Sequence, residues 1–183
     1  TFEKMFSEDA INIVNSNFNI EYVNFIDTKH DSIDFDFSNG NLNHAKFINT
    51  DNDAIDFSGS NADITNLYFE KIGDKSISVG ENSIINISNV KAFQSYVGIA
   101  SKDGSTVNAK KIYMTDVKLP FISFNKKNEY KPAKMYLSEV DLNEFHEKWV
   151  TDKNSKIYFE KSKVGTISKK LIPIVYEKKI QLL

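Results

Sequence analysis

The 183-residue sequence contains no cysteine, which excludes disulfide bonds and thiol chemistry. It also contains no arginine and only three prolines. No apolar run approaches the roughly 20 residues that a membrane-spanning helix needs, so no membrane span is predicted. The net charge of -2 does not favour nucleic acid as a partner. The chain starts at Thr1, without a methionine or a signal peptide, and we interpret it as a processed protein or a fragment of a longer one.

The charge is distributed unevenly along the chain. Residues 1–60 contain eleven acidic residues and three lysines, whereas residues 118–183 contain fourteen lysines and eight acidic residues. A rod-shaped molecule would therefore be acidic at one end and mildly basic at the other. The simplest interpretation is a solvated surface.

A repeat of 22 residues dominates the sequence. One copy is the stretch DAIDFSGSN at 53–61, and its isoleucine recurs at a constant spacing of 22 residues. The isoleucines of this series are Ile11, Ile33, Ile55, Ile77 and Ile99. A period in this range indicates a solenoid, in which each repeat stacks on the next to bury a continuous core.

Each repeat predicts three short strands. Apolar residues alternate with polar ones, as in Ile55/Phe57, Ala62/Ile64 and Leu67/Phe69, and the bursts are separated by Ser, Asn, Asp and Gly. Alternation with period two indicates strands rather than helices. Three strands per coil of about 22 residues predict an all-β fold, a right-handed single-stranded parallel β-helix of six to seven coils.

Equivalent residues of stacked coils should form ladders about 4.8 Å apart. We expect an aliphatic ladder from Ile11 to Ile99 and aromatic stacks of Phe35 on Phe57 and of Phe25, Phe47 and Phe69. A Ser-Asn pair recurs at 16–17, 38–39 and 60–61. Because Asn tolerates left-handed geometry and stacked amides bond along a ladder, this pair predicts a repeated turn.

The pattern loosens after residue 124. A polar loop is expected over 125–132, and such insertions often lie on a binding face. We assign the regular coils to residues 1–150, and the last coil with a C-terminal cap of the same domain to residues 151–183. Within this cap, residues 171–176 (LIPIVY) read as a last apolar strand, and Pro173 marks it as an edge strand.

The runs FDFSNG, DAIDFSGSN, GDKSISVGENS and VGIASKDGS resemble the right-handed β-helix proteins of the pectin-lyase-like superfamily. More narrowly, they resemble a β-helix module found at the C-terminus of some bacterial envelope or CotH-type proteins, and NKKNEYKPA resembles the loop of that module. The resemblance covers residues 30–160. It implies the fold, but no activity, because this superfamily includes lyases, hydrolases, epimerases, tail spikes and noncatalytic adhesins.

The strongest candidate site is an acidic patch, formed by Asp31, Asp34, Asp36, Asp53 and Asp56. Asp34 and Asp56 each follow an inward isoleucine, so both should point outward from one sheet, about 5 Å apart. Like charges this close raise each other's pKa unless a bound cation, a shared proton or a lysine compensates.

Three roles remain open for this patch. Asp34 and Asp56 are the candidate catalytic pair, acting as general acid and base with Asp31 and Asp53 in support, as outward carboxylates do in β-helix hydrolases. Alternatively, the patch contacts a sugar or a metal: Asp31, Asp36 and Asp53 are candidate binding residues, and Asp31, Asp34, Asp53 and Asp56 are candidate ligands for Ca²⁺, the only cofactor considered. The third interpretation is a solvated acidic face. The absence of arginine counts against the commonest lyase arrangement, and nothing in the sequence selects Lys75 or Lys102 as its replacement.

Other residues give weaker signals. The three histidines share no ligand spacing, so no zinc site is predicted. Tyr22, Tyr68 and Tyr113 occupy related outward positions on the third strand, where they either stack on sugar rings or shield the sheet. Tyr130 is a candidate binding residue in the loop at 125–132, with Tyr96 and Trp149 beside that loop.

The sequence therefore favours a noncatalytic module of a larger bacterial surface or envelope protein, with a structural or carbohydrate-contacting role. Its expected partners are polysaccharide and further domains of the same polypeptide, outside the cell or in the cell envelope. The alternative is a polysaccharide-active enzyme, a hydrolase, lyase or epimerase, that uses the acidic patch.

Overall fold

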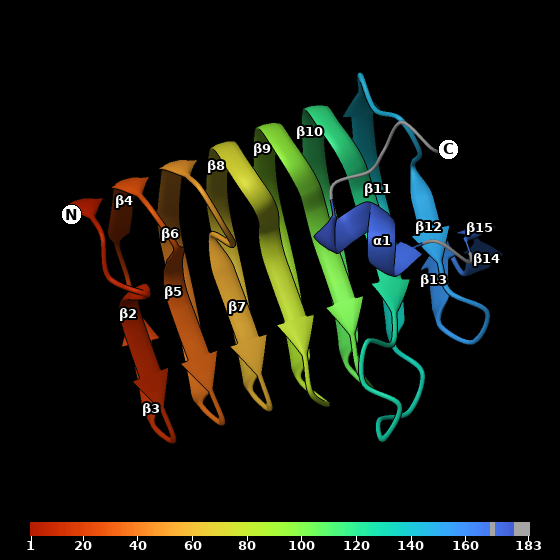
Figure 1. Ribbon diagram of the computed structural model, residues 1–183, viewed down its shortest axis with the longest axis horizontal. Helices are drawn as coiled ribbons and strands as arrows, with labels where there is room; N and C mark the ends of the chain where they lie inside the picture. The colour runs from red at the N-terminus through yellow and green to blue at the C-terminus, as the bar shows by residue number, and fades with distance from the viewer. Residues whose placement is uncertain (169–170, 178–183) are drawn as a thin grey trace.

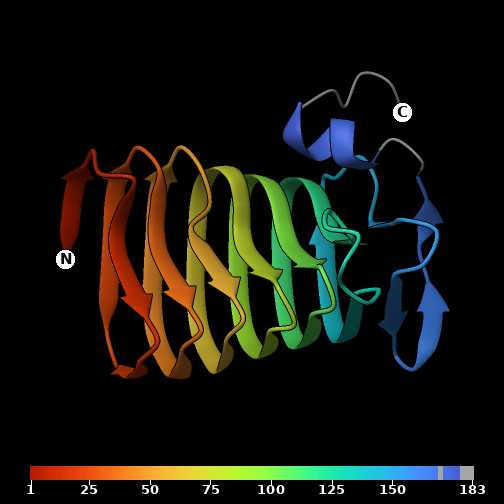
Figure 2. The ribbon, with the colours of Figure 1, turned by 60° about the horizontal axis from the view of Figure 1, so that its bottom comes forward.

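The computed structural model describes residues 1–168 and 171–177, and it shows a β-solenoid of about seven turns (Figure 1). The coils follow one another along the long axis, and nearly all neighbouring strands are parallel (Figures 1 and 2). The predicted all-β parallel solenoid of about 22 residues per coil is confirmed. Among the described residues, no helix is long and apolar enough to cross a membrane.

Short strands build the N-terminal coils, and long bent strands build the central ones. The short N-terminal strands are β1 (Phe2–Met5), β2 (Asp9–Val14), β3 (Asn17–Ile20), β4 (Val23–Thr28), β5 (Asp31–Asp36) and β7 (Ile55–Ser58). The longer strands are β6 (Asn39–Thr50), β8 (Asn61–Gly80), β9 (Ile84–Lys102), β10 (Thr106–Phe124) and β11 (Lys134–Asn143). The C-terminal elements are β12 (Trp149–Thr151), β13 (Lys156–Phe159), β14 (Ser162–Val164), β15 (Thr166–Ile167) and α1 (Leu171–Tyr176).

The pairing divides the solenoid into three faces. Face 1 comprises β2, β5, β7, the last segments of β8, β9 and β10 (75–80, 97–102 and 119–124), and β12. Face 2 comprises β3, the first segments of β6, β8, β9, β10 and β11 (39–43, 61–65, 84–88, 106–110 and 134–138), and β13. Face 3 comprises β1, β4 and the segments 45–50, 67–72, 90–95, 112–117 and 140–143.

The expected ladders fill the interior. Ile33 pairs with Ile55 and Ile77 with Ile99, and all four are fully buried. The rings of Phe35 and Phe57 stack at 4.8 Å on face 1. On face 3, the three stacked rings lie 5.2 and 5.1 Å apart; they belong to Phe25, Phe47 and Phe69. Burial of these side chains is the main source of stability, because no single coil can bury them alone.

The Ser-Asn pairs form the corner between faces 1 and 2, in a different way from that expected. The positive φ falls on the residue before the serine, at Phe37 (φ 50°) and Gly59 (φ 63°). The serines then link the coils, since the N–H of Ser38 donates to Oγ of Ser60 at 2.8 Å. The asparagine amides bond along the ladder, as predicted, with Nδ2 of Asn61 donating to Oδ1 of Asn39 at 2.9 Å.

The prediction of a last apolar strand over 171–176 is wrong, because this segment is helix α1. Leu171 and Val175 lie four residues apart, on one side of the helix, and both are buried. Pro173 is the third residue of the helix. The N–H groups of the first turn have no acceptor within the helix, so a proline, which lacks this group, is tolerated there. The rest of the predicted cap that is described comprises the end of β12 and β13, β14 and β15, with β14 antiparallel to β13.

Helix α1 lies outside the coils, against face 1 (Figure 2). It packs on outward-pointing apolar side chains of the C-terminal coils, and this second cluster is separate from the interior. Its members on the sheet are Val97, Ala100, Leu119, Ile122, Phe124 and Val150. The predicted loop at 125–132 is confirmed, since it connects the end of β10 to the start of β11.

Candidate functional site

The outer surface of face 1 changes character along the axis. One ladder runs through Asp31, Asp53, Lys75 and Val97. The next ladder runs from Asp34 and Asp56 through Ser78 to Ala100 and Ile122. The N-terminal half of this face is therefore acidic, and its C-terminal half is apolar and covered by α1.

Asp34 and Asp56 lie side by side in adjacent strands, as predicted. Asp36 lies two residues further along β5, opposite Ser58. The Oδ1 atoms of Asp34 and Asp56 are both shielded from solvent and accept no hydrogen bond within the described residues. Two shielded carboxyl oxygens without donors are costly when ionised, so this pair favours holding protons.

Asp31, Asp53 and Lys75 form a bonded column at the start of the face. The N–H of Asp53 donates to Oδ1 of Asp31 at 2.9 Å, and the N–H of Lys75 donates to Oδ1 of Asp53 at 2.9 Å. The ammonium of Lys75 lies 3.2 and 3.3 Å from the two oxygens of Asp53 and 2.7 Å from Oδ2 of Asp74. The Lys75 side chain is only 3% exposed, so this lysine is a buried counter-ion.

A second lysine approaches the acidic pair. Nζ of Lys102 lies 3.7 Å from Oδ1 of Asp56. The sequence analysis did not select either lysine, although the 22-residue repeat indicated the position of Lys75. Lys75 follows Asp53 by one repeat of 22 residues, so the ladder that places Asp31 beside Asp53 also places Lys75 there.

Burial raises the pKa values of Asp31, Asp34 and Asp56 on this face. The pKa of Asp31 is raised to about 7 by burial and by the neighbouring Asp53. The pKa of Asp34 is raised to about 8 by burial and by Asp56. Burial also raises the pKa of Asp56, against the opposing charge of Lys102. Near neutral pH, this cluster therefore contains carboxyl groups able to donate a proton.

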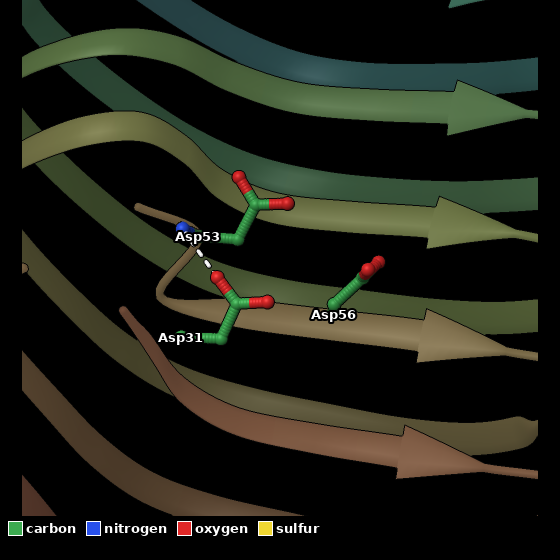
Figure 3. A group of neighbouring side chains, drawn as sticks. All are labelled: Asp31, Asp53 and Asp56. Carbon is green, nitrogen blue, oxygen red and sulfur yellow. Dashed lines mark hydrogen bonds between the residues drawn. The ribbon is translucent and has the colours of Figure 1, made fainter. Parts of the chain in front are cut away.

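The geometry also bears on the calcium prediction. One oxygen from each of Asp31, Asp53 and Asp56 lies within 4.8 Å of the others, and Figure 3 shows Asp31 and Asp53 next to each other, with Asp56 to one side on β7. Carboxylate oxygens suit Ca²⁺, which takes six to eight oxygen ligands from carboxylates, carbonyls and water. Both oxygens of Asp53 already face the Lys75 ammonium, however, so a cation would compete with this lysine.

A long groove lies elsewhere, on the outer surface of face 2. It has a volume of about 900 Å³, and none of the face 1 acids lines it. Its floor is a ladder of outward side chains, one from each coil: Asn19, Asn41, Asp63, Asn86, Asn108, Tyr136 and Tyr158. The seven rungs extend over roughly 30 Å at the spacing of stacked strands.

Three of the polar rungs of the groove are bonded to each other. Nδ2 of Asn86 donates to Oδ1 of Asp63 at 2.7 Å, and Nδ2 of Asn108 donates to Oδ1 of Asn86 at 2.9 Å. At the C-terminal end the rings of Tyr136 and Tyr158 stack, with centroids 5.0 Å apart and planes within 8°. Tyr136 remains 41% exposed, so the stacked pair presents an aromatic surface to the groove.

The predicted row of Tyr22, Tyr68 and Tyr113 is not one ladder. Tyr68 and Tyr113 share a ladder of face 3, where Phe93 packs between them. Tyr22 lies instead at a corner, 75% exposed, and stacks on His44. The prediction is wrong for Tyr22. Two repeats of 22 residues span 44 residues, so the spacing of 46 residues between Tyr22 and Tyr68 places Tyr22 two positions away from this ladder.

Tyr130 lies within the loop between β10 and β11, and its backbone carbonyl accepts a hydrogen bond from Asn125. The same loop directs Lys126 towards α1, where Nζ lies 4.5 Å from the centroid of the Tyr176 ring. Lys75 lies 5.2 Å from the same ring, so Tyr176 borders the acidic half of face 1.

No protein-family model, curated protein or solved structure matches the chain. The resemblance to pectin-lyase-like and CotH-type proteins therefore depends on the repeat alone, and it stays a prediction. The structure shows that the chain is a parallel β-solenoid repeat protein.

Proposed function

We propose that this chain is a noncatalytic β-solenoid module of a larger bacterial surface or envelope protein, and that it contacts polysaccharide through the groove of face 2. Further domains of the same polypeptide would supply other activities. A β-solenoid is suited to contact with a polysaccharide, because equivalent side chains repeat at a constant spacing along a stiff axis.

The groove is the observation that carries this proposal. Its amide ladder presents donors and acceptors at intervals of about 4.8 Å, comparable to the advance of an extended pyranose chain per sugar. Nδ2 of Asn108 donates one N–H to Asn86, and its second N–H remains for a ligand. A long polar trough of this kind suits a linear chain of hydroxyl groups.

The stacked tyrosines support the same conclusion. Tyr136 and Tyr158 line one end of the groove with stacked rings. Aromatic rings combine an apolar face with a polar tip, and they supply contact area at little entropic cost. Sugar rings have apolar faces of matching size, so this pair is the expected anchor of a bound chain.

A glycan-array screen followed by calorimetry on the same sample tests the proposal. We expect binding of an extended polysaccharide or oligosaccharide, weakened about tenfold or more by Tyr136→Ala combined with Tyr158→Ala. The matched control is Tyr68→Ala combined with Tyr113→Ala, two tyrosines of one ladder on face 3, which should leave affinity unchanged.

Two results would refute this assignment. Failure to bind any glycan would remove the carbohydrate role and leave the solenoid as a scaffold. Binding that is lost in the face 3 variant and kept in the face 2 variant would move the site to Tyr68 and Tyr113. Circular dichroism of each variant verifies that the fold is retained.

The second candidate function is a polysaccharide-active enzyme using Asp34 and Asp56. The raised pKa values of both carboxyl groups, and Lys102 at 3.7 Å from Asp56, are the observations that favour it. In this proposal Asp34 is the general acid, which donates a proton to the leaving group, and Asp56 is the general base. Ca²⁺ at Asp31, Asp53 and Asp56 would serve the same face.

Release of reducing ends or of unsaturated products from a polysaccharide panel tests the enzyme directly. Asp34→Asn and Asp56→Asn should each abolish turnover while keeping the fold. A calcium titration by calorimetry, repeated on Asp56→Asn, tests the metal. Turnover that survives in both variants would exclude the pair, and heat of calcium binding unchanged by Asp56→Asn would exclude the metal site.

A further inference from the structure

The C-terminal end of the face 2 groove is flanked by lysines. Thr106, Lys134 and Lys156 form the ladder two residues before the rungs Asn108, Tyr136 and Tyr158. Because residues i and i+2 of a strand point to the same side, both lysines project from the same face as the tyrosines. Both lysines are exposed.

A second hollow adjoins this ladder. It has a volume of about 260 Å³ and is lined by Lys131, Lys134 and Lys156 together with Gly104, Thr106, Pro132, Ala133 and Asn154. Of the residues that the structure describes, no acidic side chain lines it. Within residues 1–168 and 171–177, no carboxylate forms an ion pair with any of its three lysines.

The two central lysines are direct neighbours. Lys134 and Lys156 pair in the parallel register of β11 and β13, so their Cα atoms are about 4.8 Å apart. Like charges directly opposite on neighbouring strands repel each other. An anion between the two ammonium groups would replace this repulsion with two charge-assisted hydrogen bonds.

The opposite end of the groove has the opposite charge. Glu21 and Asp63 line it there, among asparagines. At the tyrosine end, Lys110 and Lys161 line the groove on the side away from Lys134, accompanied by Glu160. Oε1 of Glu160 accepts the N–H of Glu139 at 3.1 Å. The groove therefore has an electrostatic polarity along its length.

We propose that the C-terminal end of this groove binds the anionic group of an acidic glycan. Lys134, Lys156 and Lys131 hold a carboxylate, sulfate or phosphate group, while the sugar that bears it packs against the exposed parts of the Tyr136 and Tyr158 rings. The neutral part of the chain extends over the asparagine rungs towards Asp63, so the glycan binds in one direction. This inference rests on the proposed carbohydrate-binding function.

The test compares two oligosaccharides with the same backbone, one neutral and one carrying uronic acids, by calorimetry. A sulfated and a phosphorylated derivative identify which anion is preferred. We expect the acidic chain to bind at least tenfold more tightly than the neutral one at low salt, and this advantage to shrink as ionic strength rises.

The informative variant is Lys134→Gln combined with Lys156→Gln. It should remove the preference for the acidic chain and leave the affinity for the neutral chain unchanged. Lys91→Gln combined with Lys111→Gln is the matched control, because both lysines are exposed and neither lines the groove or the second hollow, and it should keep the preference. Both variants replace each ammonium group with a neutral polar amide, and circular dichroism verifies their folding.

The failures of the two proposals are distinguishable. Equal binding of neutral and acidic chains, or a preference unchanged by Lys134→Gln and Lys156→Gln, overturns the anion site and leaves the groove as a glycan site. Absence of binding to every glycan overturns both. A preference lost in the Lys91→Gln and Lys111→Gln control would reflect net charge rather than a site, and it overturns the inference as well.

Discussion

Lys75 occupies the position in its coil that Asp53 occupies in the coil before, and its ammonium lies 3.2 Å from Oδ1 of Asp53. This ladder places aspartates on one another in the first coils and then a lysine, before it continues to Val97. Burial lowers the pKa of Lys75, but the carboxylates of Asp53 and Asp74 outweigh it and raise this pKa overall. The lysine is therefore charged, and it neutralises the column.

Removal of this lysine should destabilise the protein strongly. Lys75→Met keeps the volume but leaves the 5%-exposed Asp53 without its counter-ion. Breaking a buried pair from one side costs about 3–5 kcal/mol. We expect a loss of this order in the free energy of unfolding, measured by urea denaturation followed by circular dichroism.

Lys91→Met is the control for this substitution, because Lys91 is exposed on face 3. It should change stability by less than about 0.5 kcal/mol. Addition of Asp53→Asn to Lys75→Met should recover part of the loss, since the uncompensated charge is then removed. Equal stability of the wild type and Lys75→Met would show that the pair is not a stabilising contact.

The acidic half of face 1 predicts an unusual pH dependence of stability. The pKa of Asp31 is raised from 3.8 to about 7, and that of Asp34 from 3.8 to about 8. Between the unfolded pKa of 3.8 and these folded pKa values, the folded protein therefore binds more protons than the unfolded chain. The contribution of these groups is fully present below pH 4 and is lost as the pH rises to about 8. We expect the urea midpoint to fall across this range.

Asp31→Asn combined with Asp34→Asn tests the assignment of this dependence. An amide does not titrate in this range and avoids the charge repulsion, so the double variant should have a flatter profile and a higher midpoint at pH 8 than the wild type. Wild-type stability that rises between pH 5 and pH 8 would contradict the raised pKa values.

The sequence predicted the interior of the fold because burial imposes a strict period. A side chain that shifts by one residue in a strand points to the other side, so Ile55 and Phe57 specify both the strand and its register. The adjacency of Asp34 and Asp56 followed from the same register. Lys75 was equally predictable from Asp53, and its role was missed because only the acids were followed along the ladder.

Features outside the repeat could not be read in the same way. Six residues of α1 are too few for a helical period to emerge, and their conformation is decided by packing on Ala100 and Ile122. The outward position of these two apolar residues was the available signal, because an apolar outer ladder requires a cover. The groove of face 2 depends on the shape of the sheet and on Glu160 and Lys161 at its end, which no periodicity specifies.

The register itself is testable with one substitution at two positions. Ile55→Asp introduces a carboxylate at a fully buried rung of the interior ladder, where no partner is available. We expect loss of cooperative unfolding and of the native circular dichroism spectrum. Ile84→Asp is the matched control, because Ile84 points outward from face 2 and is 50% exposed. Native-like Ile55→Asp protein, or an unfolded Ile84→Asp protein, would contradict the register.

The attachment of α1 to face 1 depends on two side chains. Leu171 is 2% exposed and Val175 is fully buried, in contact with the outer apolar cluster. Truncation of a buried leucine to alanine costs about 2–5 kcal/mol. A helix of six residues is not stable by itself, and its remaining contacts do not compensate for this loss. We therefore expect Leu171→Ala combined with Val175→Ala to detach the helix and to expose Ala100 and Ile122, while the coils stay folded. Hydrogen exchange should increase in α1 alone, whereas Ile172→Ala, at a position 45% exposed, should leave exchange unchanged. Protection of α1 that survives the double variant would show that contacts elsewhere hold this helix in place.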